Sequence, residues 1–335
     1  MEIIIIKLGA IGDVIRTTSI LPGLKEKYKG CRIGWITKKA SFDVLKNNYA
    51  IDEVYLIDSD LKKPNNKRYD LIISLDDDKD ACELASGINH KKIIGAFLKD
   101  GKRVYTDNSS LWFDMGLISR FGKKKADELK AKNKKTYQEV IYKILGLKYE
   151  KQEPVLILND NESKFGENFA SKNNIKKNDL VIGINTGAGG RWQDKKLSIQ
   201  ETAELIDKLN NQIKNSKILL FGGPEEKERN YKIKKAVKAK ILDAGCDNSL
   251  MEFASLVNLC NVLVTSDSLA LHIGTALKKK IVVFFYPTSA SEIELYSRGI
   301  KIIGKGKSYC SYQTKCIYPP QWDINKIVDA VKKLV

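Results

Sequence analysis

The chain has 335 residues, of which 43% are hydrophobic and 30% are charged. This composition is typical of a globular protein of about two domains, and it excludes disorder and a collagen-like repeat. The longest apolar runs, residues 3–6 and 281–286, are far shorter than the roughly 20 residues that span a bilayer. The N-terminus also lacks the pattern of a signal peptide. We therefore expect a cytoplasmic protein.

The net charge is strongly positive, at +17 from 58 basic and 41 acidic residues. Such a charge favours anionic partners, which are nucleic acid, anionic lipid or a phosphorylated substrate. Many of the lysines are scattered, as in residues 123–135, and no arginine-rich tail or aromatic RNA-binding motif accompanies them. The alternative is a lysine-rich solvated surface with no partner.

The cysteines and histidines limit the metal chemistry. Six cysteines are spread along the chain without a CxxC pair, so reduced thiols are expected. Cys310 and Cys316 are the nearest pair, and a zinc or redox role is their alternative interpretation. The two histidines, His90 and His272, are too few for a three-histidine metal site. We expect neither a metal nor a cofactor.

The first half of the chain alternates short apolar runs with helical stretches. Residues 2–7 predict a buried strand, and a glycine turn at 8–13 then opens a helix that runs to about residue 28. The middle, residues 109–147, is expected to be helical and polar. Further strands are predicted at residues 32–37, 53–57, 71–75 and 92–95.

The alternation restarts at residue 180, after a helix predicted at 161–173. Ser198 and Glu201 have the spacing of a capping box at a helix start. The predicted strands are residues 181–185, 217–221, 262–265 and 281–286. The predicted helices are residues 198–213, 249–260, 269–277 and 324–334.

Strands that alternate with helices predict an α/β fold with parallel sheets. We expect two such halves, a first domain at residues 1–155 and a second at 178–320. In open α/β sheets ligands bind beyond the carboxyl ends of the strands, so two facing halves would form a cleft.

Two common nucleotide-binding signatures are absent. No GxxxxGK[ST] loop occurs, which argues against a P-loop ATPase or kinase. Glycines 187, 189 and 190 do not complete GxGxxG, because Trp192 occupies the last position. This argues against a nicotinamide-dependent dehydrogenase.

The first of three remaining turns contains Gly9, Gly12 and Asp13. The two glycines allow close backbone approach, and the helix start favours an anion. Asp13 is interpreted either as a first-turn or capping acid, or as a base that faces the cleft. A carboxylate at the positive end of a helix stays ionised, which suits proton removal.

The other two turns follow strands of the second half. In residues 186–195, backbone amides with Thr186, Arg191 and Lys195 could wrap a phosphate, although an ordinary surface loop is the alternative. In residues 266–272, Ser268 begins a helix that could hold a phosphate, and His272 could donate to the same ligand. A core histidine is the alternative for His272.

These three sites together resemble glycosyltransferase family 9, whose best-known members are the ADP-heptose:lipopolysaccharide heptosyltransferases. The first strand and GAIGDVIRTTSILPGLKEKY resemble the opening of that family, and ILLFGGPEEKERN resembles its acidic helix start. NTGAGGRWQDKKLS resembles the family's loop followed by a lysine. SDSLALHIGTALKKKIVVFFYPTS resembles its most specific block. The resemblance covers nearly the whole chain, in order.

The resemblance implies the GT-B fold, with two Rossmann-like domains facing a central cleft, and a last helix at 321–335 that crosses back to the first domain. It implies an inverting, metal-independent transfer of a heptose from ADP-heptose to a lipopolysaccharide-core or other glycan acceptor. The implied partners are the nucleotide sugar, a phosphorylated glycolipid or glycan and, peripherally, the inner face of an anionic membrane, with no nucleic acid.

The resemblance also assigns residues. Asp13 is the implied catalytic base, and Gly9, Gly12 and Arg16 form the acceptor-side loop. Thr186, Gly187 and Lys195 would bind the donor, with Lys195 at its phosphates. Glu226, or its neighbour Glu225, would contact the ribose or sugar. Asp267 would hold sugar hydroxyls, with Ser268 and His272 at the phosphates.

Two positions depart from the family pattern. Leu269 stands where heptosyltransferases usually have glycine, and Thr186-Gly187 replaces a Pro-Gly start. Asp76-Asp77-Asp78 is the nearest imitation of a metal-binding DxD motif, but it lies in the wrong half. The alternative functions are a non-catalytic binding module for anionic lipid or nucleic acid, and a nucleotide-sugar 2-epimerase. The low histidine count argues against the epimerase.

Overall fold

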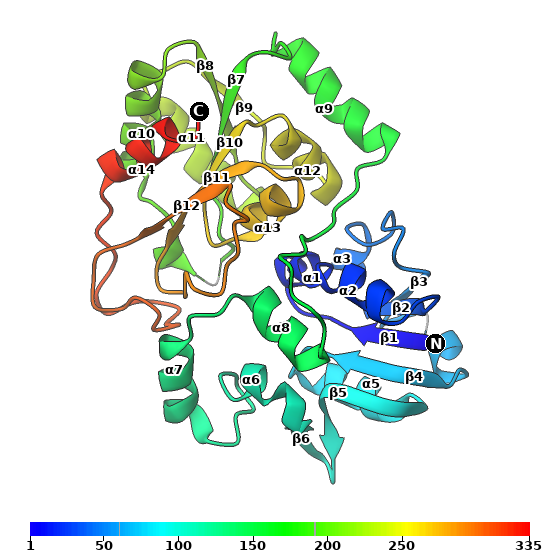
Figure 1. Cartoon of the computed structure of the whole chain (residues 1–335). Coiled ribbons are helices and arrows are strands. Elements are labelled where there is room, and N and C mark those ends of the chain that lie inside the picture. The colour runs from blue at the N-terminus through cyan, green and yellow to red at the C-terminus, as the bar shows by residue number, and fades with distance from the viewer. Residues whose placement is uncertain (60, 191) are drawn as a thin grey trace. The chain divides into compact units, whose positions relative to one another are not determined.

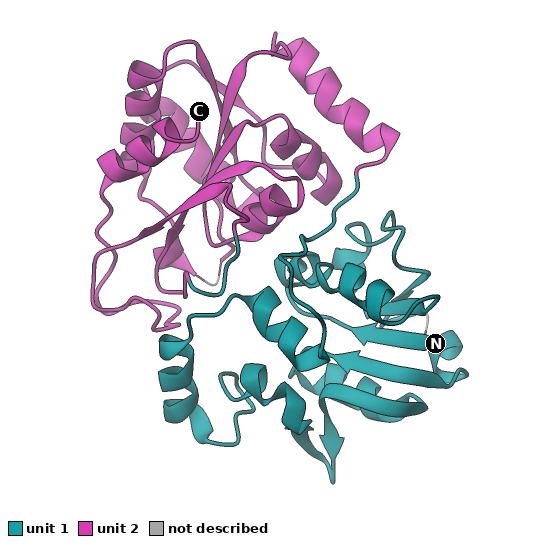
Figure 2. Cartoon of the chain, viewed as in Figure 1, with its two compact units in different colours: residues 1–157, 291–294 teal, residues 158–290, 295–335 magenta. Residues whose placement is uncertain are grey.

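The computed structural model describes residues 1–59, 61–190 and 192–335 (Figure 1). The described residues form two compact units (Figure 2). Unit 1 comprises Met1–Ile157 and Ser291–Glu294, and unit 2 comprises Leu158–Ala290 and Leu295–Val335. Within the described residues, no helix has the length and apolar character needed to cross a membrane.

Unit 1 is built on one sheet with the strand order β3-β2-β1-β4-β5-β6. All neighbouring strands are parallel except β5 and β6, which are antiparallel. The strand order reverses between β1 and β4, and ligands of open α/β sheets bind at the carboxyl ends of strands at such a point. The strands are β1 (Glu2–Ile6), β2 (Arg32–Thr37), β3 (Glu53–Leu56), β4 (Tyr69–Ser74), β5 (His90–Lys99) and β6 (Lys102–Tyr105).

The apolar runs of β1 and β4 explain their central place in the sheet. Ile3, Ile4, Ile5 and Ile6 are fully buried, because helices cover both faces of a parallel sheet. The helices of unit 1 are α1 (Ile11–Thr17), α2 (Ile20–Lys27), α3 (Lys39–Phe42), α4 (Lys62–Asn65), α5 (Lys79–Gly87), α6 (Ser110–Phe113), α7 (Gly122–Lys132) and α8 (Tyr137–Leu145).

The helix predicted to run to about residue 28 is divided into α1 and α2. The interruption lies at Thr18 and Ser19. The Thr18 hydroxyl donates to the Ile15 carbonyl at 2.7 Å and the Ser19 hydroxyl to the Arg16 carbonyl at 2.8 Å. Such local bonds compete with the helical ladder, so α1 ends one turn after Asp13.

Unit 2 contains a parallel sheet with the order β12-β11-β10-β7-β8-β9. Its strand order reverses between β7 and β10, which gives a second such point at their carboxyl ends. The sequence analysis missed the edge strands β9 and β12, because edge strands are short and lack a fully apolar run. The strands are β7 (Leu180–Asn185), β8 (Ser216–Phe221), β9 (Ile241–Asp243), β10 (Val262–Ser266), β11 (Lys280–Phe285) and β12 (Gly299–Ile303).

Several helices of unit 2 begin at a capping residue. Ser198 and Glu201 form the predicted capping box of α10, and Ser249 with Glu252 forms another on α12. The helices are α9 (Asp160–Lys172), α10 (Ile199–Gln212), α11 (Lys227–Ala236), α12 (Leu250–Asn258), α13 (Leu269–Ala276) and α14 (Ile324–Lys332).

The expectation that the last helix crosses back to the first domain is wrong. Ile327, Val328 and Val331 of α14 are buried in the core of unit 2, against α10 and β11. The apolar face of α14 is therefore buried against its own unit, unit 2. Instead, residues 291–294 belong to unit 1, where the Tyr137 amide donates to the Glu292 carbonyl at 2.9 Å.

Unit 2 begins at Leu158, whereas the sequence placed its start at residue 178. The reason is the packing of α9 on α12. The Gly166 amide donates to the Ser255 hydroxyl at 3.0 Å, and a Cβ at Gly166 would lie only 2.6 Å from that hydroxyl oxygen. A glycine on α9 thus allows the close approach that fixes this helix to unit 2.

Candidate functional site

The turn after β1 carries the candidate base of unit 1. Ala10 occupies the N-cap position of α1 and Asp13 lies in its first turn, so Asp13 is not the capping residue. Gly12 is buried within α1. A carboxylate in the first turn of a helix is stabilised by the N-terminal amides, which favours its ionised form.

A buried ion pair fixes this turn to the neighbouring strand. Lys7 and Asp76 form a salt bridge, and their side chains are 5% and 9% exposed. Asp76 also accepts from the amides of Leu8 and Gly9. Burial alone would lower the pKa of Lys7, but Asp76 together with Tyr137 and Asp13 outweighs it, and the pKa is raised. Lys7 therefore stays charged and holds the Asp76 carboxylate against the turn.

Gly9 is required by the same contact. A Cβ at this position would lie 3.0 Å from Asp76 Oδ1. This contact is tighter than most real Cβ contacts, so a side chain at residue 9 would push the Asp76 carboxylate away. Gly9 was predicted to allow a ligand to approach the backbone, but in the structure it allows the Asp76 carboxylate to lie close to the turn.

Asp13 is held by Arg16 and an aromatic cluster. Arg16 Nη2 lies 2.9 Å from Asp13 Oδ1, with side-chain exposures of 12% and 35% respectively. The Arg16 guanidinium lies 3.9 Å from the ring centroid of Tyr137, a cation–π contact. The Tyr137 hydroxyl lies 2.7 Å from Thr17 Oγ1, which completes the support. The Asp13 carboxylate is thus oriented yet partly open to solvent.

In unit 2, Asn185 joins the two loops that the sequence singled out. Its Nδ2 donates to the Gly187 carbonyl at 2.8 Å and to Thr265 Oγ1 at 3.0 Å. It also lies within 3.3 Å of Ser268 Oγ. The loop after β7 and the loop after β10 are therefore fixed side by side at the carboxyl ends of adjacent strands.

Lys195 and Asp267 meet at this edge of the sheet. Lys195 Nζ donates to both Oδ2 and the backbone carbonyl of Asp267, at 2.9 Å each. The Thr288 hydroxyl, beyond β11, donates to the same Oδ2 at 2.7 Å. Burial alone would raise the pKa of the Asp267 carboxyl, but Lys195, His272 and the hydrogen bond from Thr288 lower it below its usual range.

Ser268 and His272 lie on the start and second turn of α13. Ser268 is the N-cap residue, and its hydroxyl lies 3.0 Å from Thr265 Oγ1 instead of capping the helix. His272 is partly exposed and close enough to lower the pKa of the Asp267 carboxyl. His272 is therefore not a fully buried core histidine.

Glu226 supports the other side of the loop after β7. It is 4% exposed, pairs with Lys196 Nζ at 2.8 Å and accepts from the Gly223 amide at 3.1 Å. A Cβ at Gly187 would lie 2.9 Å from Glu226 Oε2, so the glycine lets the carboxylate lie against the loop. Glu225, by contrast, is exposed.

Thr186 is bound behind the loop. Its hydroxyl lies 2.6 Å from Asn230 Oδ1 and 3.0 Å from the Phe221 carbonyl, and both contacts are buried. The side chain is therefore used within the protein, and only the backbone of Thr186 remains for a ligand. Arg191, which the sequence placed in the same loop, lies outside the described residues.

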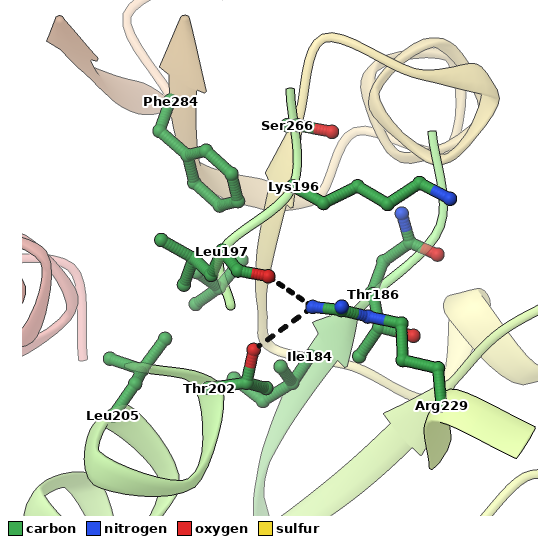
Figure 3. Close-up of a pocket in the computed structure, with 11 residues that line it drawn as sticks. Ile184, Thr186, Lys196, Leu197, Thr202, Leu205, Arg229, Ser266 and Phe284 are labelled. Carbon is green, nitrogen blue, oxygen red and sulfur yellow. Dashed lines mark hydrogen bonds between the residues drawn. The ribbon is translucent and has the colours of Figure 1, made fainter. Parts of the chain in front are cut away.

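A small pocket lies behind the same loop, on the α10 side of the sheet (Figure 3). Thr186 and Lys196 line it together with Arg229 of α11. Arg229 donates to the Leu197 carbonyl and lies 3.4 Å from Thr202 Oγ1 (Figure 3). Burial lowers the pKa of Arg229. The arginine thereby joins α11 to the start of α10 and stiffens the base of the loop.

The sequence analysis missed several residues that position these groups. Lys7 was assigned only to a strand, and Asn185 only to a strand end. A polar residue that directly follows a buried parallel strand is the signal that could have found Asn185 and Asp76. Nothing in the local pattern marks Asn230 or Thr288, which reach the site from other elements.

The cysteines give no metal site among the described residues. No group of three or more histidine, cysteine or acidic side chains could hold an ion there, and Cys310 and Cys316 are free thiols. Burial raises the pKa of Cys316 to about 11, with Asp194 adding to the effect. The Cys316 thiol is therefore protonated and unreactive at neutral pH.

Comparison with known proteins identifies the family. Residues 61–320 match the model of glycosyltransferase family 9 (heptosyltransferase). No curated protein matches the chain.

Solved structures share the fold over the whole chain. A family 9 glycosyltransferase from Veillonella parvula has 17% identity and a TM-score of 0.77, covering 99% of this chain and 96% of its own. ADP-heptose lipopolysaccharide heptosyltransferase II of E. coli has 18% identity and a TM-score of 0.66, covering 100% and 98%. E. coli heptosyltransferase WaaC, solved with ADP, has 16% identity and a TM-score of 0.67, covering 100% of both chains.

These similarities agree with the α/β class and GT-B architecture expected from the sequence. The family match spans more than half of the chain and includes the Lys195, Glu226 and Asp267 loops. The chain therefore belongs to glycosyltransferase family 9, the heptosyltransferase family, and is a glycosyltransferase.

Proposed function

We propose that this enzyme transfers a heptose from ADP-heptose, with inversion, to a lipopolysaccharide-core or other glycan acceptor. The observation that carries the proposal is the Lys195–Asp267–Thr288 cluster at the carboxyl ends of the central strands of unit 2. E. coli WaaC, which shares the fold, was solved with ADP and with an ADP-2-deoxy-2-fluoro heptose. The cation and the carboxylate of this cluster support the proposal of such a donor.

Lys195 is proposed to bind the diphosphate. An ammonium group has three N–H donors, and two of those of Lys195 go to Asp267. The ammonium also lies 5.2 Å from the ring centroid of Trp192. Its third donor is proposed to bind a phosphate oxygen of the donor. The backbone amides of residues 187–190 and the start of α13, with Ser268 and His272, would add donors to the leaving diphosphate.

Asp267 and Glu226 are proposed to receive hydroxyl groups of the donor. Asp267 Oδ2 is already bonded to Lys195 and Thr288, so its second oxygen is proposed to accept from sugar hydroxyls. Glu226 is anchored by Lys196 and Gly223, which orients its carboxylate towards the loop at Gly187. A carboxylate fixed in this way suits the ribose hydroxyls.

Asp13 is proposed as the general base. In the reaction, Asp13 takes the proton of an acceptor hydroxyl, whose oxygen forms a bond to the anomeric carbon of the sugar. The bond from that carbon to the phosphate oxygen breaks, and the electron pair leaves with the diphosphate. Arg16 and the Gly9–Gly12 turn would position the carboxylate and the acceptor. The charge on the leaving group would be stabilised by the donors of unit 2 without a metal.

The acceptor is proposed to be a phosphorylated glycolipid at the inner face of the membrane. The net charge of +17 supports this class, because it attracts anionic surfaces and phosphorylated substrates. Membership of the glycosyltransferase family favours this function over a non-catalytic binding module and over a 2-epimerase.

The proposal is tested by thermal shift with ADP, UDP and their sugars, with EDTA present throughout. A ligand that binds only the folded protein raises the unfolding temperature with its concentration. We expect ADP and ADP-heptose to stabilise the protein in EDTA. Stabilisation that disappears in EDTA and returns only with Mg²⁺ would refute the metal-free donor site. Stabilisation by UDP but not by ADP would refute a donor that carries adenosine diphosphate.

A further inference from the structure

Residues 305–321, which connect β12 to α14, form a closed loop that we call the 305–321 loop (Figure 1). The Lys305 amide donates to the Gln321 carbonyl at 3.0 Å, and the Gln321 amide donates back to the Lys305 carbonyl at 2.9 Å. The base of the loop is thus fixed by paired backbone hydrogen bonds.

The inner side of the 305–321 loop is anchored to unit 2. The Tyr286 hydroxyl donates to the Tyr318 carbonyl at 2.6 Å and accepts from the Ser308 amide at 2.9 Å. It therefore joins the segment that leaves the base of the loop to the segment that returns to it. A Cβ at Gly306, whose φ is +151°, would collide with that hydroxyl. The Cys316 amide donates to Asp194 Oδ2 at 2.6 Å. These contacts give the loop one defined shape.

The loop exposes both apolar and basic side chains. Ile317 is 75% exposed and Tyr318 is 52% exposed. The Lys307 ammonium lies 5.5 Å from the ring centroid of Tyr318, and Lys305 and Lys315 are exposed as well. The inner contacts prevent Ile317 from turning into the core, so its apolar surface remains in water.

The loop's own sequence carries charge of one sign, although Asp194 bonds its Cys316 amide and Asp323 follows it. Residues 299–322 contain four lysines and no acidic residue. Helix α7 is another lysine-rich surface, next to the exposed Leu117 and Phe121, but it includes Asp127 and Glu128. Lys125 of α7 pairs with Glu128 at 3.2 Å. By their own residues, the 305–321 loop is therefore more uniformly positive than α7.

We propose that the 305–321 loop docks the enzyme on an anionic lipid bilayer. Ile317 and Tyr318 enter the interface, where tyrosine is favoured, and Lys305, Lys307 and Lys315 face the phosphate headgroups. A bilayer offers both hydrocarbon and negative charge. A nucleic acid would be contacted chiefly through the lysines, and the loop has no arginine for bidentate phosphate or base contacts.

This inference rests on the proposed function, because a membrane-resident acceptor gives the docking its purpose. The test is co-sedimentation of the full-length protein with phosphatidylcholine vesicles, with and without phosphatidylglycerol, in the absence of donor and acceptor. We expect recovery only with the anionic vesicles and a loss at high salt. Removing the charges with Lys305→Gln, Lys307→Gln and Lys315→Gln should weaken binding about fivefold per lysine. Ile317→Ser with Tyr318→Ser should weaken it about tenfold.

The matched control is Tyr231→Ser with Lys235→Gln on α11. Tyr231 is 57% exposed and Lys235 Nζ lies 5.7 Å from its ring centroid, so the pair repeats the Tyr318–Lys307 chemistry elsewhere. This variant should bind vesicles like the wild type. Unfolding temperatures of all variants establish that each one folds.

Equal recovery with both vesicle types would overturn the proposal. So would loop variants that bind as the control does, or a loss caused instead by Lys123→Gln, Lys124→Gln and Lys125→Gln in α7. Loop-dependent binding to RNA without binding to vesicles would also overturn it. Failure of the proposed function is separable, because it would abolish stabilisation by ADP while vesicle docking through the loop persisted.

Discussion

Lys195 Nζ lies 2.9 Å from Asp267 Oδ2, and this pair joins the loop after β7 to the loop after β10. Its side chains are only 9% and 17% exposed, so the attraction between them is weakly screened. The pair lies 72 residues apart in sequence, yet it brings a cation and a carboxylate to the edge where parallel sheets bind ligands.

Lys195→Ala should weaken ADP binding at least tenfold and also lower the rate of transfer. The reason is that the ammonium contacts charge that is present on the donor both before and during the reaction. Titration calorimetry with ADP measures the first effect and steady-state assays the second. Lys217→Ala is the control, because Lys217 is also ion-paired, to Asp179 at 2.9 Å. Lys217 lies at the N-terminal end of β8, away from the carboxyl ends of the strands where Lys195 lies. Unchanged ADP affinity in Lys195→Ala would remove Lys195 from the donor site.

Asp13→Asn should keep the fold and the ADP affinity while turnover falls roughly 10²–10⁴-fold, the usual contribution of a positioned general base. Ala10, not Asp13, is the N-cap residue of α1, so the helix should tolerate the change. Thermal unfolding and ADP titration check the first two points, and transfer to the acceptor checks the third. Near-normal turnover of this variant would reject Asp13 as the base.

Lys7→Met should destabilise unit 1 by about 3–5 kcal/mol, because it leaves the Asp76 carboxylate buried without its cation. Urea unfolding followed by tryptophan fluorescence, to which the buried Trp35 of the adjacent strand β2 contributes, measures the loss. Combining Lys7→Met with Asp76→Asn should recover part of the stability, since no buried charge then remains. A double variant less stable than Lys7→Met would contradict the assignment of the cost to the unpaired carboxylate.

The stability contributed by Asp267 should depend on pH. The pKa of its carboxyl is lowered in the folded state, so the contribution is complete above the unfolded pKa, about 3.9, and is lost as pH falls through the lower folded value. Asp267→Asn should therefore be less stable than the wild type at pH 7, with a difference that shrinks below about pH 4. Thermal unfolding of both proteins between pH 3 and 7 measures this. A difference that stays constant over this range would exclude the charged pair as its source.

The sequence by itself determined the strands at the centres of the two sheets and the turns that follow them. Residues 3–6 and 281–285 are continuous apolar runs, and only burial on both faces of a parallel sheet accommodates such runs. Glycines and capping residues likewise marked the loop after β7 and the start of α10, because these signals act within a few residues.

The tertiary structure alone decided which distant groups meet. Helix α14 has an apolar stripe that any complementary surface could bury, and only packing against α10 and β11 assigned it to unit 2. Asp76 was interpreted from its neighbours as part of an acidic run, yet pairing of β4 with β1 placed it on Lys7 and the Gly9 turn. Such partners depend on strand order and register. These arise from many weak contacts across the whole sheet, so no local pattern specifies them.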